Sequence, residues 1–211
     1  MMIQASTIET ESRFGVAAKH RFFTQDGGSD RLLIILPGYG YTGEYPLLYF
    51  LRSAALELGW DVLTVQYGFQ AAQTDTTAET MLYVQDDVEQ AAQPVLARGY
   101  GRVCIAGKSL GTPLAVDLAG RITGAAVSLL LLTPVGGATT MVGTTRTLAL
   151  IGTADERYQP DLAPDTAHLT WRVFDELNHS LEKPGDWRAS LSALGEIIAA
   201  CAAFLDQTAY G

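Results

Sequence analysis

The sequence predicts an α/β protein with a mostly parallel, doubly wound sheet and helices on both faces. Short runs rich in leucine and β-branched residues recur along the chain, and nearly all are continuously apolar, which is typical of strands covered on both faces. Segments with a helical period lie between these runs, and such alternation gives parallel sheets with right-handed crossovers. The 211 residues contain no internal repeat or linker, so a single domain over residues 1–211 is expected.

Six apolar runs of strand length are the expected parallel strands. They are Arg31 to Leu36, Asp61 to Tyr67, Arg102 to Ala106, Ala125 to Thr133, Thr147 to Ile151 and Leu169 to Phe174. Ahead of them, Phe14 to Thr24 alternates weakly and predicts one or two antiparallel edge strands.

Four segments predict helices. Pro46 to Leu58 and Thr112 to Arg121 each follow an expected strand, and the apolar period from Met81 to Val95 ends near Arg98-Gly99. A fourth helix is expected after Asp186, its candidate N-cap. Its predicted buried stripe consists of Trp187, Leu191, Leu194, Ile198, Cys201 and Leu205.

Composition and charge narrow the function classes. Hydrophobic residues make up 48% of the chain and charged residues 18%, which excludes extensive disorder. The net charge of −9 repels phosphate backbones and anionic lipid, so we expect no nucleic-acid partner and no membrane partner. Cys104 and Cys201 lack metal-ligand spacing, and we expect no metal site and no cofactor. The first residues do not resemble a signal peptide, and the apolar run Ala125 to Leu132 is too short to span a bilayer. We therefore expect a cytoplasmic protein. The sequence does not predict its oligomeric state.

The segment Gly107-Lys108-Ser109-Leu110-Gly111 is a candidate nucleophile elbow. It follows the expected strand Arg102 to Ala106 and precedes a helix, which is the context that a Gly-x-Ser-x-Gly turn requires. A serine on so sharp a turn has an unfavourable backbone, and side chains at the flanking glycines would collide with neighbouring elements. We therefore predict Ser109 as a nucleophile.

A serine nucleophile needs a base, and the chain has three histidines. His20 lies in the N-terminal strands and His168 lies at the amino end of a strand, away from the active edge. His179 follows the carboxyl end of Leu169 to Phe174, on the same sheet edge as Ser109, and is the predicted base.

The acid that orients the base is expected between nucleophile and histidine. No Asp or Glu occurs between Asp117 and Asp155, so Asp155, one short turn beyond a strand, is the first candidate. Its competitors are Glu156, Asp161, Asp165, Asp175 and Glu176.

A developing oxyanion needs backbone N–H donors. Leu110, directly after the nucleophile, supplies the first, and the glycine-rich loop 37–43 supplies the second. Tyr39 is the candidate and Gly40 the alternative.

These residues resemble the α/β-hydrolase superfamily over about residues 30–206, and they look most like its small lidless, dienelactone-hydrolase-like members. The resemblance implies a serine hydrolase of esters or related acyl compounds that works through an acyl-enzyme without metal or cofactor. Pro37 stands where many esterases of the superfamily carry a histidine. The link from Pro134 to Arg146, where larger relatives insert a cap, is too short for one, so an open pocket is expected.

The substrate is expected to be a small acyl compound, a carboxylester or a thioester. Tyr39, Tyr41, Tyr45, Tyr67 and Phe69 fall at the predicted active edge, where they either line an apolar pocket or pack as ordinary core. Lys108 beside the nucleophile is either a solvated surface residue or a partner for an anionic group. The alternatives to an esterase are an amide or peptide hydrolase and a non-catalytic binding protein on the same scaffold.

Overall fold

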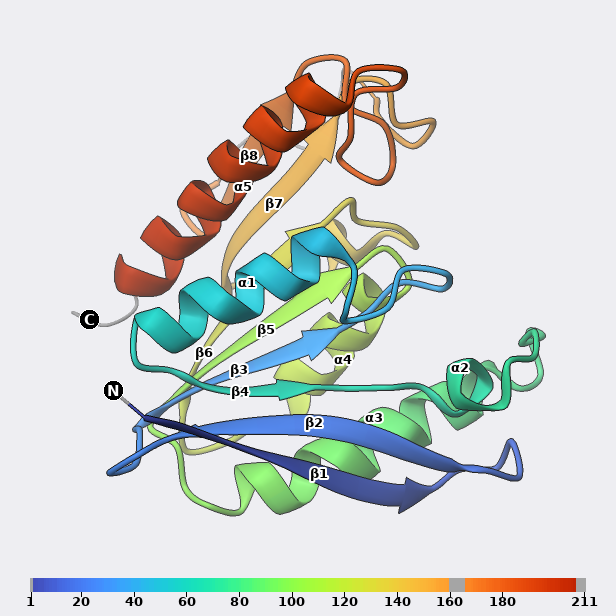
Figure 1. Cartoon of the computed structure of the whole chain (residues 1–211), viewed down its shortest axis with the longest axis vertical. Helices are drawn as coiled ribbons and strands as arrows, with labels where there is room; N and C mark the ends of the chain where they lie inside the picture. Colours follow the sequence, from blue (N-terminus) through green and yellow to red (C-terminus); the bar gives the residue numbers. More distant parts are fainter. Residues whose placement is uncertain (1, 160–165, 208–211) are drawn as a thin grey trace.

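A computed structural model describes residues 2–159 and 166–207 and shows one eight-stranded sheet flanked by helices (Figure 1). The strands are β1 (Ile3–Glu11), β2 (Ala17–Gln25), β3 (Arg31–Leu36), β4 (Asp61–Thr64), β5 (Arg102–Lys108), β6 (Ala126–Leu132), β7 (Arg146–Gly152) and β8 (Leu169–Phe174). The helices are α1 (Pro46–Glu57), α2 (Gly68–Ala72), α3 (Met81–Leu96), α4 (Gly111–Arg121) and α5 (Trp187–Gln207), with a short 3₁₀ turn, η1 (Ala138–Thr140).

The sheet order is β1-β2-β4-β3-β5-β6-β7-β8. β3 to β8 run parallel to one another, whereas β1 and β2 add an antiparallel ribbon at the β4 edge. The mostly parallel, doubly wound fold class is therefore confirmed. Because the parallel strands end at one edge, the loops after β3, β5, β7 and β8 gather there, which is where ligands bind in open α/β sheets.

Two apolar layers cover the sheet. α1 and α5 pack on one face, and α2, α3 and α4 pack on the other (Figure 1). Both faces of the central strands are shielded from solvent. In β3, every residue from Leu32 to Leu36 is fully buried. Successive side chains of β3 pack into opposite apolar layers. A strand buried on both faces therefore needs a continuous apolar run.

The N-terminal ribbon is longer than its sequence pattern predicts. β1 spans Ile3–Glu11, ahead of the expected segment, and pairs along its whole length with β2. Most of its residues are exposed, so β1 lacks the buried face that produces a period-two pattern. β4 ends at Thr64 and not at Tyr67, where the expected strand ended. The chain then leads into α2, which is too short to show a helical period in the sequence.

The predicted buried stripe of α5 is wrong at its start. Trp187 and Leu191 are 62% and 59% exposed, whereas the buried residues are Ile197, Cys201, Phe204 and Leu205. The contacts of α5 with the buried layer begin at Ala193, so within the described residues the first turns of the helix contribute no side chain to that layer. The expected N-cap is confirmed, because Asp186 Oδ1 accepts a hydrogen bond from the N–H of Ala189 at 3.0 Å.

α5 is also long and apolar enough to cross a membrane by length and composition alone. In this fold it packs against α1 and the sheet through its C-terminal half.

Candidate active site

Ser109 occupies a tight turn between β5 and α4. Its φ of 50° lies in the left-handed region, which is unfavourable for a residue with a side chain. The flanking glycines permit this turn, because a Cβ on Gly107 would overlap the backbone of α4 and one on Gly111 would overlap the backbone of Leu36. The turn projects Ser109 at the carboxyl edge of the sheet.

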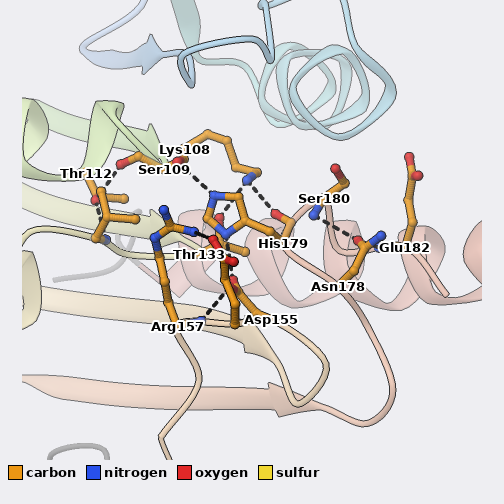
Figure 2. A network of polar contacts seen from close by, with 12 residues as sticks. Lys108, Ser109, Thr112, Thr133, Asp155, Arg157, Asn178, His179, Ser180 and Glu182 are labelled. Carbon is orange, nitrogen blue, oxygen red and sulfur yellow. Dashed lines mark hydrogen bonds and ion pairs between the residues drawn. The ribbon is translucent and has the colours of Figure 1, made fainter. Parts of the chain in front are cut away.

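The structure brings Ser109, His179 and Asp155 together (Figure 2). His179 Nε2 lies 2.8 Å from Ser109 Oγ, and His179 Nδ1 lies 2.7 Å from Asp155 Oδ2. The serine follows β5, the aspartate follows β7 and the histidine follows β8, so the sheet aligns three loops that are distant in sequence. This is the geometry that a nucleophile, a base and an orienting acid require.

The carboxylate of Asp155 is fully buried and both of its oxygens are used. Oδ1 accepts the backbone N–H of Arg157 at 3.0 Å, and Oδ2 faces His179 Nδ1. With Nδ1–H donating to Asp155, Nε2 is left as the acceptor for the hydroxyl of Ser109.

The electrostatics favour a neutral imidazole. Burial lowers the pKa of His179, and the hydrogen bond and charge of Asp155 oppose that effect, whereas the charges of Lys108 and Arg157 lower the pKa further. His179 is therefore unprotonated near neutral pH and able to accept a proton.

The loop that carries His179 is organised by Asn178. Its Oδ1 accepts the backbone N–H groups of Ser180 and Glu182 at 2.9 and 3.1 Å (Figure 2). Leu181 adopts a φ of 60° within this turn. The role of Asn178 was missed in the sequence, although asparagine before a functional loop residue is typical of such side-chain-capped turns.

The glycine-rich loop after β3 lies directly beside the serine. A Cβ on Gly38 would lie 3.5 Å from Ser109 Cβ. Below the loop, the hydroxyl of Tyr67 donates to the carbonyl of Pro37 at 2.9 Å, and Gln70 Nε2 donates to the carbonyl of Gly38 at 2.8 Å. These bonds engage the carbonyls of Pro37 and Gly38, and the N–H of Gly38 donates to the carbonyl of Tyr41 at 2.9 Å.

The candidate oxyanion donors are all unengaged. Within residues 2–159 and 166–207, the N–H groups of Leu110, Tyr39 and Gly40 have no hydrogen-bond acceptor. Leu110 follows the nucleophile, and Tyr39 and Gly40 follow Gly38 in the adjoining loop, so each is free to donate to a bound oxygen.

A pocket of about 440 Å³ adjoins these groups. Its lining residues are Gly38, Tyr39, Gly40, Tyr41, Tyr45, Lys108, Ser109, Arg157, His179, Ser180 and Glu182. Tyr39, Tyr41 and Tyr45 thus lie where a pocket was expected. Tyr67 and Phe69 do not, because both are buried under the glycine-rich loop, where Phe69 stacks on Tyr39 with ring centroids 5.1 Å apart.

The interpretation of Lys108 as a solvated surface residue is wrong. The side chain is 1% exposed rather than solvated. Its ammonium donates to Thr133 Oγ1 at 2.6 Å and to the backbone carbonyl of His179 at 2.7 Å, and the residue also lines the pocket beside Ser109.

The competing acids lie outside this arrangement or have other partners. Asp175 accepts a hydrogen bond from Thr153, and Glu176 pairs with Lys183. Glu156 pairs with the exposed side chain of Arg157. Asp161 and Asp165 lie outside the described residues.

The other two histidines are also remote from Ser109 in their contacts. His20 lies between Thr10 and the backbone of Gln66, and the carbonyl of His168 accepts the N–H of Thr147 at the amino end of β7.

The described part of the chain holds no group of three or more metal-ligating side chains. A second cavity, of about 450 Å³, lies between α3 and α4 near Gln93 and Arg121, at the amino ends of the strands and away from the serine.

The sequence matches no protein-family model and no curated protein, but solved structures resemble the fold closely. A protein of unknown function from Agrobacterium tumefaciens, named as an α/β hydrolase, superposes with a TM-score of 0.71 at 16% identity over 96% of each chain. A lidless α/β serine hydrolase from Xanthomonas campestris gives 0.68 at 16% identity over 92% of each chain. Est1E from Butyrivibrio proteoclasticus, solved with ferulic acid bound, gives 0.70 at 11% identity over 94% of this chain and 97% of its own.

The link between β6 and β7 contains only η1, and no cap is inserted there. Sheet order, elbow position and these structural neighbours agree: the chain has the α/β-hydrolase fold, in a form with minimal cap.

Proposed function

We propose that the protein is a serine hydrolase that cleaves small esters through an acyl-enzyme. The observation that carries this proposal is the hydrogen-bonded chain from Ser109 Oγ through His179 to the buried carboxylate of Asp155, with contacts of 2.8 and 2.7 Å. A left-handed serine on a glycine-flanked elbow has no evident structural benefit, and strained residues concentrate at functional sites.

The geometry supports a two-stage reaction. Ser109 Oγ attacks the acyl carbon while its proton moves to His179 Nε2, and the carbonyl oxygen becomes an oxyanion. The N–H group of Leu110 and that of Tyr39, or alternatively Gly40, donate to this oxyanion. The intermediate then collapses, and the alcohol leaves with the proton from Nε2.

Water completes the cycle. It loses a proton to His179 Nε2 as its oxygen attacks the acyl carbon, and collapse of the second intermediate releases the acid and returns the proton to Ser109 Oγ. Throughout, Asp155 holds Nδ1–H and stabilises the transient imidazolium. The proposed chemistry uses only these side chains, backbone N–H groups and water.

The pocket supports a small substrate with an apolar or aromatic group. Its volume of about 440 Å³ lies at the small end of ligand sites, and three tyrosines line it. Tyr41 and Tyr45 lie with ring centroids 4.8 Å apart, tilted by 38°, and form an aromatic part of the pocket lining. Because no cap is inserted in the link after β6, we propose that the pocket is open to solvent. We therefore expect turnover of soluble short-chain substrates without activation at a lipid interface.

A fluorophosphonate probe tests the proposal most directly. We expect stoichiometric labelling of Ser109, and none in Ser109→Ala, whose folding is checked by its thermal melt. No labelling of the folded wild-type chain would favour a non-catalytic binding protein on the same scaffold.

A matched series of p-nitrophenyl esters, a thioester and an anilide then defines the substrate. Highest kcat/KM on short esters or thioesters supports the proposal, whereas faster anilide cleavage would favour an amide or peptide hydrolase. A jump in rate when a long-chain ester passes its solubility limit would contradict the open pocket.

A further inference from the structure

Lys108, the residue before the nucleophile, is a buried cation without an ion pair. Within the described ranges 2–159 and 166–207, no carboxylate lies within 4.0 Å of its ammonium. Removing an ammonium from water is costly, and an apolar side chain at this place would avoid that cost. The buried charge therefore points to a role beyond the stability of the fold.

The contacts of this ammonium join separate parts of the site. It donates to Thr133 Oγ1 at the end of β6 and to the backbone carbonyl of His179, at 2.6 and 2.7 Å (Figure 2). Nζ also lies 5.3 Å from the ring centroid of Tyr41, in the loop beside Ser109. Two of the three N–H donors of the ammonium thus have acceptors on separate elements, and the charge faces the Tyr41 ring.

Thr133 gives a second, independent indication. It is fully buried with a φ of 48°, which is a genuine outlier for a β-branched residue. Its backbone N–H donates to the carbonyl of Leu150 at 2.7 Å, which anchors the residue to β7. A strained residue thus presents its hydroxyl to Lys108 from a rigid part of the sheet.

We propose that Lys108 is a positioning residue that ties the backbone of His179 to the end of β6 and so sets the imidazole against Ser109. The loop with His179 is held at Leu177, whose carbonyl accepts the N–H of Ala154 at 3.0 Å, and by the buried side chains of Leu177 and Leu181. Lys108 adds a connection at the backbone of His179 itself, between the residues that anchor the loop on either side. This inference rests on the hydrolase function proposed above.

The charge has a consequence that a neutral tether would not have. His179 is faced by Ser109 from the elbow, by Asp155 and Arg157 from the loop after β7, and by Lys108 from β5; Tyr41 and Glu182 line the same pocket. Burial lowers the pKa of His179, Asp155 raises it, and Lys108 and Arg157 lower it. Loss of the ammonium alone should therefore raise the pKa of His179.

The test compares Lys108→Met with Lys183→Met. Lys183 lies in the same loop as His179 but pairs at the surface with Glu176. Its replacement therefore removes one positive charge, as Lys108→Met does, but leaves the contact between Lys108 and the backbone of His179 in place. For Lys108→Met we expect kcat to fall by about 10²-fold, the effect of a misplaced catalytic group, with KM changed by less than about threefold. The acidic limb of kcat/KM and the NMR titration of His179 should both move to higher pH, and Lys183→Met should change neither.

Thr133→Val separates the tether from the charge. Valine keeps the branched shape, removes the acceptor and leaves the ammonium in place. We expect a loss in kcat of about tenfold, as one hydrogen bond is worth, with the titration of His179 unchanged. This variant also tests the tether if Lys108→Met, which removes a buried charge but leaves Thr133 Oγ1 and the carbonyl of His179 without their donor, does not fold.

The inference is overturned if Lys108→Met keeps kcat within threefold and His179 titrates as in the wild type, or if Thr133→Val has full activity. Failure of the hydrolase function is distinguishable. If wild-type protein neither labels at Ser109 nor turns over esters, the NMR titration of His179 and the amide signals of residues 177–182 still report on Lys108, and their constancy in Lys108→Met would refute the positioning role.

Discussion

Asp155→Asn changes the hydrogen-bond pattern of the site without changing its shape. In the wild type, Oδ1 accepts the backbone N–H of Arg157 and Oδ2 accepts Nδ1–H of His179, at 3.0 and 2.7 Å. An asparagine has one oxygen and one NH₂ group. The main-chain N–H of Arg157 can only donate, so the asparagine oxygen should turn toward it and the NH₂ toward His179. His179 Nδ1 then becomes an acceptor, the proton resides on Nε2, and Nε2 can no longer take the proton of Ser109.

The expected loss is large because the wrong tautomer is held in place. In serine-protease triads the same substitution lowers kcat by about 10⁴, or about 5 kcal/mol of transition-state stabilisation. We expect a loss of that order with KM nearly unchanged, measured by stopped-flow or steady-state hydrolysis of a short p-nitrophenyl ester. Nitrogen-15 NMR of the imidazole should show the proton moving from Nδ1 to Nε2.

The pH dependence provides a second readout. The hydrogen bond and charge of Asp155 both raise the pKa of His179, so the substitution should lower that pKa further. Because the free base is the active form, the acidic limb of residual kcat/KM should move to lower pH.

Asp175→Asn is the matched control. Asp175 is exposed and bonds to Thr153, outside the chain from Ser109 to Asp155, so kcat should stay within about twofold of wild type. Retention of more than a tenth of kcat in folded Asp155→Asn, or an unchanged Nδ1–H tautomer, would refute the reasoning. A strong loss only with Asp175→Asn would move the acid to that residue.

Three further predictions concern stability. Gly107→Ala should lower the free energy of unfolding by about 3 kcal/mol through overlap with the backbone of α4, whereas Gly120→Ala, with open space in the same helix, should be neutral or stabilising by up to about 1 kcal/mol; urea unfolding checks both. Tyr67→Phe should cost about 1–2 kcal/mol and reduce kcat, because the carbonyl of Pro37 loses its buried donor; equal stability and activity would contradict this support for the loop. Burial lowers the pKa of His20 to about 4, so the unfolded chain, with a pKa of about 6.5, binds a proton first as the pH falls. Stability should therefore drop by up to about 3 kcal/mol between pH 6.5 and 4, and His20→Gln should show a smaller drop in urea titrations at pH 7 and 4.5.

The sequence predicted much of the sheet because the local pattern and the final burial agree there. The runs at β3 and β8 match the structure at both ends, since a strand covered on two faces must be apolar throughout. β1 escaped prediction because it is exposed on most of its length and is held by backbone pairing with β2, which leaves little trace in side-chain chemistry.

Part of the candidate site could also be predicted. Ser109 was indicated by the glycines of a turn that only they permit, and Asp155 and His179 by their positions just beyond strands that end at one edge. Such positions converge in any parallel sheet, because the strands point the same way. The distances of 2.8 and 2.7 Å that join the three side chains required the structure.

Burial at particular positions was decided only by the tertiary structure. Lys108 looked like a surface residue, yet the meeting of β6 with the loop of His179 encloses its ammonium and gives it two acceptors. Trp187 continued an apolar stripe, yet it is 62% exposed, and among the described residues α5 joins the buried layer only from Ala193 onward. Sequence alone therefore determined the succession of the parallel strands and of the four longer helices along the chain, because steric and periodic constraints act locally. What each side chain contacts was set by segments far away along the chain, because burial depends on which surfaces meet in space.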